Sequence, residues 1–163
     1  MGRSAAVTRQ GWLAYGLAAV VVILDQISKF WILNVFDLPA RGHVPVAPFF
    51  SLSMVWNRGV SFGMLRAEVD LARWGLAAFS FAVAIALIVW ARKTHRLLTA
   101  VALGLVVGGA IGNLIDRVRF GAVADFLDFS GLWFPWVFNV ADSGITVGVI
   151  LLLIDSALPH RKG

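Results

Sequence analysis

Long apolar runs separated by short charged clusters dominate the chain, and they predict four helices. A membrane-spanning helix needs about 20 mainly apolar residues at a rise of ~1.5 Å per residue. Four stretches fit, at residues 12–33, 72–91, 97–115 and 137–158. The first qualifies only if its helix continues through Asp25 and Lys29, and the fourth only if it carries Asp142. We therefore expect one polytopic membrane domain over residues 1–163.

The two longer connections, residues 34–71 and 116–136, carry patterns of their own. Residues 49–56 (FFSLSMVW) are apolar and partly alternating, and they lie between two prolines and Gly59. This pattern predicts a strand at the membrane surface. The segment 66–70 is interpreted as a mobile amphipathic lid.

Composition narrows the class of protein further. The chain is 60% hydrophobic and only 14% charged, whereas a typical soluble domain has about 25% charged residues. This excludes a disordered protein, a nucleic-acid-binding module and most soluble enzymes. The chain contains no cysteine, which excludes disulfides, thiolate metal sites and thiol nucleophiles.

The distribution of basic residues orients the predicted bundle. At one end the predicted helices are flanked by seven bases and no acid, whereas the connections at the other end hold six bases and six acids. By the positive-inside rule, both termini and the short second loop are cytoplasmic and the longer connections lie outside. The sequence thus predicts an all-α membrane protein with four transmembrane helices and both termini cytoplasmic. The seven bases are Arg3, Arg9, Arg92, Lys93, Arg96, Arg161 and Lys162.

Acidic residues in or near the apolar segments need an explanation, because a charge at the bilayer centre costs ~2.5–3.5 kcal/mol on insertion scales. Asp25 and Lys29 are spaced i,i+4, so they share a helix face and are predicted to form a structural ion pair that ties the first helix to its neighbours. Asp155 is interpreted as a solvated acid at the cytoplasmic helix end, near Arg161.

Asp125 and Asp142 stand apart from the other acids. One follows the third predicted span and the other lies in the first turns of the fourth, so both side chains are expected at similar depth near the outer interface. Two close carboxylates share a proton, and such a pair can activate water and polarise a carbonyl. A second interpretation stays open, in which both acids pair with Arg58, Arg117 or Arg119.

The remaining motifs favour structural roles. Gly104, Gly108 and Gly112 form a small-residue face that predicts close helix packing. Asn113 and Asp116 share the outer end of that helix with Arg117 and are interpreted as a supporting polar shell. A G-x-S-x-G pattern at residues 59–63 is interpreted as a turn, because four spans leave no room for a nucleophile elbow. No spacing for metal ligands is found.

Five segments, in this order, resemble the lipoprotein signal peptidase (bacterial signal peptidase II) family over nearly the whole chain. They are residues 25–29 (DQISK), 57–63 (NRGVSFG), 108–117 (GGAIGNLIDR), 123–128 (VADFLD) and 138–145 (FNVADSGI). The resemblance implies an aspartic endopeptidase of the bacterial inner membrane, active on the periplasmic side. Members of the family remove signal peptides from prolipoproteins, cutting before a diacylglyceryl-modified cysteine.

The same resemblance assigns residues. By motif match, Asp125 and Asp142 become the catalytic dyad, which titrates as a unit. The other characteristic positions, which support the site or contact substrate, are Asp25, Lys29, Asn57, Gly59, Asn113, Asp116, Arg117, Asn139 and Ala141. The family fold also implies a small extracytoplasmic β-sheet cradle and no metal or cofactor. We expect a monomer whose partners are prolipoproteins and membrane lipids, with no nucleic acid.

Two other classes of function are alternatives to a protease. A small proton-coupled carrier also uses membrane carboxylates, but typically near the bilayer midplane and on broken helices. A non-catalytic membrane assembly factor would rely on the glycine faces and tolerate the loss of either aspartate.

Overall fold

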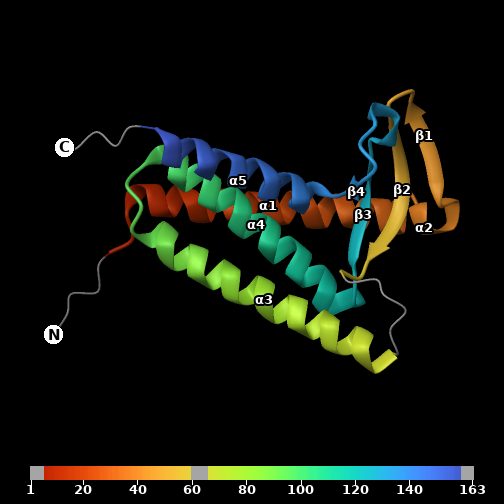
Figure 1. Cartoon of the computed structure of the whole chain (residues 1–163), viewed down its shortest axis with the longest axis horizontal. Coiled ribbons are helices and arrows are strands. Elements are labelled where there is room, and N and C mark those ends of the chain that lie inside the picture. The colour runs from red at the N-terminus through yellow and green to blue at the C-terminus, as the bar shows by residue number, and fades with distance from the viewer. Residues whose placement is uncertain (1–5, 60–65, 159–163) are drawn as a thin grey trace.

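Four long helices form the body of the protein (Figure 1). The computed structural model describes residues 6–59 and 66–158, with residues 66–69 described by their backbone alone. The helices are α1 (Arg9–Phe30, extended by a π-helical turn, Trp31–Val35), α3 (Arg66–Arg92), α4 (Leu97–Phe120) and α5 (Val140–Ala157). Each is long and apolar enough to cross a membrane. The prediction of four membrane helices is confirmed.

The helix ends differ from the predicted ones for local reasons. α4 runs to Phe120 rather than to residue 115 and ends at Gly121, whose φ of 77° is the left-handed conformation that favours glycine. Arg73 of α3 completes this end, donating from Nε to the Arg117 carbonyl at 2.8 Å and from Nη2 to the Val118 carbonyl at 2.7 Å. α5 begins at Val140 rather than at residue 137, because Asn139 caps it.

The predicted lid and the predicted turn lie only partly within the described residues. α3 begins at Arg66, so the backbone of the predicted lid, residues 66–70, is helical and continuous with the membrane helix. Its side chains at residues 66–69, and the part of the G-x-S-x-G pattern at residues 60–63, lie outside the described residues.

α4 is the central helix and packs against α1, α3 and α5. Its glycines make these contacts close, as predicted. A Cβ at Gly104 would lie 2.7 Å from the Ala14 carbonyl oxygen, and one at Gly108 would lie 2.7 Å from that of Ala18. Side chains at these positions would push α1 away from α4.

A four-stranded antiparallel sheet sits at one end of the bundle, opposite the end where α1 starts and α5 finishes (Figure 1). Its order is β1 (His43–Ala47), β2 (Phe50–Asn57), β3 (Val123–Asp128) and β4 (Val137–Phe138), with the short helices α2 (Leu38–Arg41) and η2 (Ser130–Leu132) beside it. β2 confirms the strand predicted over residues 49–56. Ile32, Leu38 and Phe126 form a buried cluster that joins the sheet to the end of α1.

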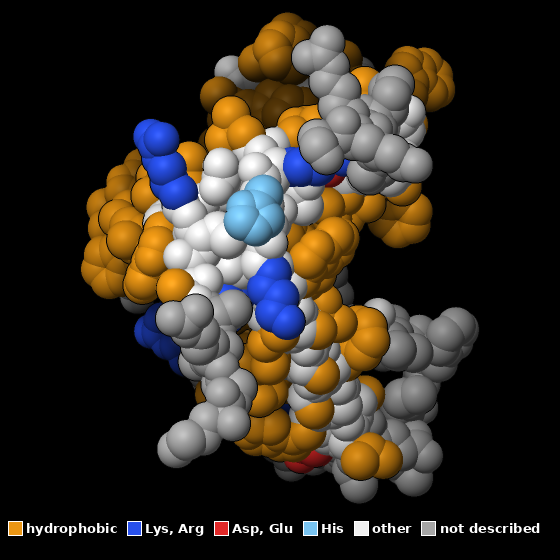
Figure 2. All heavy atoms as spheres, turned by 90° about the vertical axis from the view of Figure 1, so that its left-hand side faces the viewer, with side chains coloured by type: hydrophobic (Ala, Val, Ile, Leu, Met, Phe, Trp, Pro, Cys, Tyr) orange, Lys and Arg blue, Asp and Glu red, His pale blue; other side chains and the backbone are white. Residues whose placement is uncertain are grey.

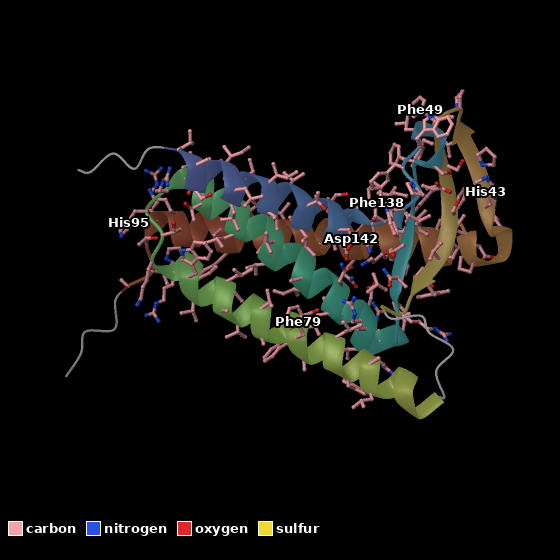
Figure 3. All side chains as sticks on the ribbon, in the orientation of Figure 1. His43, Phe49, Phe79, His95, Phe138 and Asp142 are labelled. Atoms are coloured by element: carbon pink, nitrogen blue, oxygen red, sulfur yellow. The ribbon has the colours of Figure 1, made fainter. Side chains whose placement is uncertain are left out.

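The end of the bundle far from the sheet is basic. Figure 2 looks onto this end, where Lys and Arg side chains surround a histidine, His95 in Figure 3. Asp155 lies here, but it is 6% exposed and pairs with Arg96 at 2.9 Å while Thr99 donates to it. The interpretation of Asp155 as a solvated acid was wrong, because α4 supplies partners that spacing along α5 does not reveal.

Candidate active site

Asp142 is held at the start of α5 by a capping box. The Asn139 side-chain oxygen accepts from the Asp142 backbone N–H at 2.9 Å, and the Asn139 N–H donates to Asp142 Oδ2 at 3.2 Å. This reciprocal pairing satisfies two N–H groups at the helix N-terminus. It also fixes the half-buried Asp142 carboxylate at the junction of bundle and sheet (Figure 3).

Asp125 reaches the same junction from β3. Its side chain is 2% exposed, and two amides donate to it, Asn139 Nδ2 to Oδ1 at 2.7 Å and Asn57 Nδ2 to Oδ2 at 3.0 Å. Both carboxylates therefore hydrogen-bond to one residue, Asn139, although they come from a strand and a helix. The two side chains expected to face each other are brought together.

Burial and the neighbouring Asp142 carboxylate raise the pKa of Asp125 from 3.8 to about 6, and these effects outweigh the two amide hydrogen bonds. No described residue forms an ion pair with either carboxylate. Arg117 lies close enough to interact electrostatically with both carboxylates, but its hydrogen bond goes to the Asn113 carbonyl of its own helix at 3.4 Å. The interpretation of these acids as direct ion-pair partners of nearby arginines was wrong for the described residues. Two carboxylates without a direct ion pair can share one proton near neutral pH.

Lys29 lies between two further carboxylates, those of Asp25 and Asp116. Its Nζ is 2.8 Å from Asp25 Oδ2 and 2.7 Å from Asp116 Oδ2, and all three side chains are buried. The predicted i,i+4 pair is confirmed, and Asp116 of α4 joins it. Lys29 also donates to Asn113 Oδ1 at 3.3 Å. This bond connects the ion pairs to the hydrogen bonds around Asp142.

Each carboxylate beside Lys29 holds the residue that precedes a candidate catalytic aspartate. Asp25 Oδ1 accepts from the Ala141 N–H at 3.0 Å, one residue before Asp142. Asp116 Oδ2 accepts from the Ala124 N–H at 3.1 Å, one residue before Asp125. One lysine thus stabilises two acceptors that fix the backbone on both sides of the site.

Asn113 links the ion pairs of Lys29 to the hydrogen bonds of Asp142 and Asn139. Its Nδ2 donates to Asp142 Oδ1 at 2.7 Å, and its Oδ1 accepts from Lys29 and from Asn139 Nδ2 at 3.2 Å. These partners leave only one orientation of the amide. The predicted polar shell at the outer end of α4 is present, but Asp116 is neutralised by Lys29 and not by Arg117.

Asn57, the last residue of β2, and Gly59, just after it, form one edge of the site. Asn57 Oδ1 accepts from the Gly59 N–H at 2.9 Å, which directs its amide nitrogen toward Asp125. Gly59 has a φ of 88°, and a Cβ there would lie 2.2 Å from Leu76 Cδ1 of α3. This turn requires glycine because other residues rarely adopt a positive φ.

Gln26 belongs to the site although no spacing predicted it. Its Nε2 donates to Asp25 Oδ2 at 3.1 Å and to Asp116 Oδ1 at 3.2 Å, and it approaches the Gly112 carbonyl at 3.4 Å. Gln26 and Asp25 are adjacent on α1, where neighbouring side chains do not face each other. The contact forms because α4 brings Asp116 close to Asp25, and the Gln26 amide bridges the two carboxylates. Across the described ranges, no group of three or more His, Asp or Glu could hold a metal ion.

Comparison with known sequences and structures identifies similar proteins. The family profile described as "Signal peptidase (SPase) II" matches residues 17–158. A lipoprotein signal peptidase of Caulobacter vibrioides is 56% identical over 160 residues, covering 98% of this chain and 95% of that protein. Another, from a Methylobacterium species, is 44% identical and covers 93% of this chain and 92% of its own.

A solved structure has the same fold. It is described as a bacterial membrane enzyme determined by the in meso method at 1.9 Å resolution. It superposes with a TM-score of 0.77 at 33% sequence identity, covering 93% of this chain and 96% of that one. The similarity therefore extends over nearly the whole of both chains.

Proposed function

The chain belongs to the signal peptidase II family, and from this premise we propose that Asp125 and Asp142 are its catalytic pair. It is a multi-pass membrane protease that cleaves the signal peptides of lipoproteins. One observation carries the assignment of the pair: two carboxylates from separate elements hydrogen-bond to the same asparagine, and neither forms a direct ion pair with a described residue. The substrate is a prolipoprotein, cut on the N-terminal side of its diacylglyceryl-modified cysteine.

The pair works by activating water. One carboxylate removes a proton from a water molecule, whose oxygen attacks the scissile carbonyl, while the other, protonated carboxyl donates to the carbonyl oxygen. The tetrahedral intermediate then breaks its C–N bond, and the leaving amine of the cysteine takes up a proton from the pair. The raised pKa of Asp125 supports a shared proton, since both groups ionise together only at a cost.

The other predicted site residues position this pair. Asn139 and Asn113 orient the two carboxylates, and Asn57 and Gly59 define the edge at β2. Asp25 and Asp116, with Lys29 between them, hold the backbone at Ala141 and Ala124. Arg117 lies beside the network and is proposed to contact substrate. Because one chain contributes all of these groups, we propose that it acts as a monomer.

The pH dependence of cleavage tests the shared proton. With detergent-solubilised protein and a lipid-modified precursor peptide, kcat/KM is expected to fall as the pH rises above about 6, because the pair then loses the proton that the carbonyl oxygen needs. The product should begin with the lipidated cysteine, and EDTA should not change the rate. A rate that stays constant from pH 5 to pH 9 would contradict the proton-sharing mechanism.

We further propose that the sheet faces the periplasm and that both termini are in the cytoplasm of a cell whose inner membrane holds the protein. The basic end opposite the sheet (Figure 2) supports this orientation. Because the chain has no cysteine, single substitutions at exposed positions report topology cleanly. In intact cells, a membrane-impermeant maleimide should label Ala40→Cys beside the sheet and spare His95→Cys. The reverse labelling would contradict the orientation.

Rival functions fit the site less well. A proton-coupled carrier needs its acids near the middle of the membrane, but Asp125 lies in a strand beyond the end of α4 and Asp142 in the first turn of α5. A non-catalytic assembly factor does not require two neighbouring carboxylates without a direct ion pair, an arrangement that lowers stability.

A further inference from the structure

A cavity of about 370 Å³ lies at the basic end of the bundle, far from the sheet. It is formed by the end of α3, the start of α4 and the last turns of α5, in the region where Figure 3 labels His95. Asp155 lines it, ~20 Å further along α5 than Asp142, so this cavity is separate from the candidate active site. Its lining includes Trp90, His95, Arg96, Thr99, Leu152 and Asp155.

Asp155 is the buried acid of this cavity, and one of its oxygens lacks a hydrogen bond. The Thr99 hydroxyl donates to Oδ2 at 2.5 Å, and Arg96 Nη2 lies 2.9 Å from Oδ1. The arginine supplies charge to Oδ1 but no hydrogen bond, and no other described residue donates one. The large majority of buried polar atoms in proteins have such a partner. A donor from a bound molecule is therefore expected, and a positively charged donor would bind this carboxylate most strongly.

The surroundings of the cavity are positive. Figure 2 shows Lys and Arg side chains around His95 on this face, and Asp155 is the only acid at this end among the described residues. α4 begins here, and the side chain of its N-cap residue, Arg96, does not cap the first turn. The N–H groups of that turn add to the positive potential. A ligand with an ammonium group for Asp155 should therefore also carry a phosphate, which these groups attract.

Apolar side chains continue the cavity onto the outer surface of the bundle. Leu152 lines it, Trp90 lines it while 50% exposed, and Leu97 beside it is 63% exposed. All three residues belong to helices long and apolar enough to cross a membrane, and the cavity lies at the ends of these helices. Lipid headgroups lie at this level, and tryptophan is enriched there. The ligand should therefore have hydrocarbon chains below its polar group.

We propose that this cavity binds a phospholipid with an ethanolamine headgroup. Its ammonium group donates to Asp155 Oδ1, its phosphate lies against His95 and the first turn of α4, and its acyl chains run along Trp90 and Leu152. A choline headgroup has no N–H to donate, and a glycerol headgroup has no positive charge for the carboxylate. The inference does not depend on the proposed function, because the site contains none of the residues assigned to cleavage.

Native mass spectrometry of the purified, delipidated protein tests the proposal. The Kd for phosphatidylethanolamine should be at least about tenfold lower than that for phosphatidylcholine with the same acyl chains, the scale of one charge-assisted hydrogen bond. Asp155→Asn removes the charge but keeps an oxygen for the Thr99 hydroxyl, and the preference should shrink to about twofold or less. The matched control is Asp128→Asn, the same change beside the sheet, which should leave the preference unchanged.

Equal Kd values for the two lipids in the unaltered protein would overturn the proposal, and so would an undiminished preference in Asp155→Asn. Tighter binding of phosphatidylglycerol than of phosphatidylethanolamine would also overturn it, because the cavity would then only attract anions. Free phosphoethanolamine in large excess should not displace the lipid, and displacement would assign the cavity to a soluble ligand instead. If Asp155→Asn fails to fold, phosphatidylethanolamine with a diazirine near its glycerol should crosslink to residues 90–99 or 152–156 of the unaltered protein. Labelling only elsewhere would refute the site.

Discussion

Asp125→Asn and Asp142→Asn are each expected to lower kcat for precursor cleavage at least about a thousandfold, the scale seen when one member of a catalytic unit is removed. An amide cannot accept the proton of the attacking water as a carboxylate does, and it cannot donate a carboxyl proton to the carbonyl oxygen. The measurement is single-turnover cleavage of a lipid-modified precursor by purified, detergent-solubilised protein. Combining both changes should cost little more than either one, since the two groups act together.

Asp125→Asn should also reveal the cost of the charged pair. The raised pKa of Asp125, about 6 in place of 3.8, means that the folded state binds this proton more tightly than the unfolded state. Stability from this group is thus fully present below pH 3.8 and is lost as the pH rises through about 6, by up to about 3 kcal/mol. The amide avoids that loss but gives up one of two donated hydrogen bonds, worth about 1 kcal/mol. At pH 8 the variant should unfold at a higher temperature than the unaltered protein, and at pH 4 it should not.

The matched control is Asp128→Asn, three residues further along β3. Hydrogen bonds from Ser53 and the Ser130 N–H lower the pKa of Asp128, so its carboxylate stabilises the protein above the ordinary Asp range and loses this contribution as the pH falls. Asp128→Asn should therefore keep cleavage while slightly lowering stability at pH 8. Retained cleavage in either Asp125→Asn or Asp142→Asn, with the protein folded, would refute the catalytic pair.

Much of the fold follows from local patterns. Apolar runs predicted the four helices, the alternating run predicted β2, and the i,i+4 spacing predicted the Asp25–Lys29 pair. These features depend on neighbours along one element, which the sequence displays directly. The helix boundaries were less accurate. The third span was predicted to end at residue 115, but α4 continues to Phe120, where Gly121 and the hydrogen bonds from Arg73 end it.

The site depends on contacts between elements, and these were predicted only in outline. Similar depth suggested that Asp125 and Asp142 meet, but spacing could not reveal that Asn139 bonds to both. Nor could it show that Lys29 has a second partner in Asp116, or that Gln26 lies between the two carboxylates. The contacts of Lys29 and Gln26 require the packing of α4 against α1, which brings residues more than 80 positions apart into hydrogen-bonding distance. The bond from Asn139 to Asp125 requires β3 to lie beside the start of α5.

Lys29→Met is expected to cause the largest loss of stability. The change leaves Asp25 and Asp116 buried without their shared cation, and removal of one partner from a buried ion pair typically costs about 3–5 kcal/mol. Thermal unfolding in detergent should therefore begin at a much lower temperature. Cleavage should fall as well, since the repelled carboxylates release the Ala124 and Ala141 N–H groups that fix the catalytic aspartates.

A restoring variant separates this explanation from simple misfolding. Lys29→Met combined with Asp25→Asn and Asp116→Asn removes the charges but keeps side-chain oxygens that accept from the same two N–H groups, so stability and cleavage should both recover in part relative to Lys29→Met alone. Lys93→Met, at the opposite end of the bundle, is the control. Its side chain is exposed, and the loss of such a charge should change stability by about 0.5 kcal/mol or less. If Lys29→Met were as stable as Lys93→Met, or if the triple variant recovered nothing, the lysine would not be what holds the two aspartates in place.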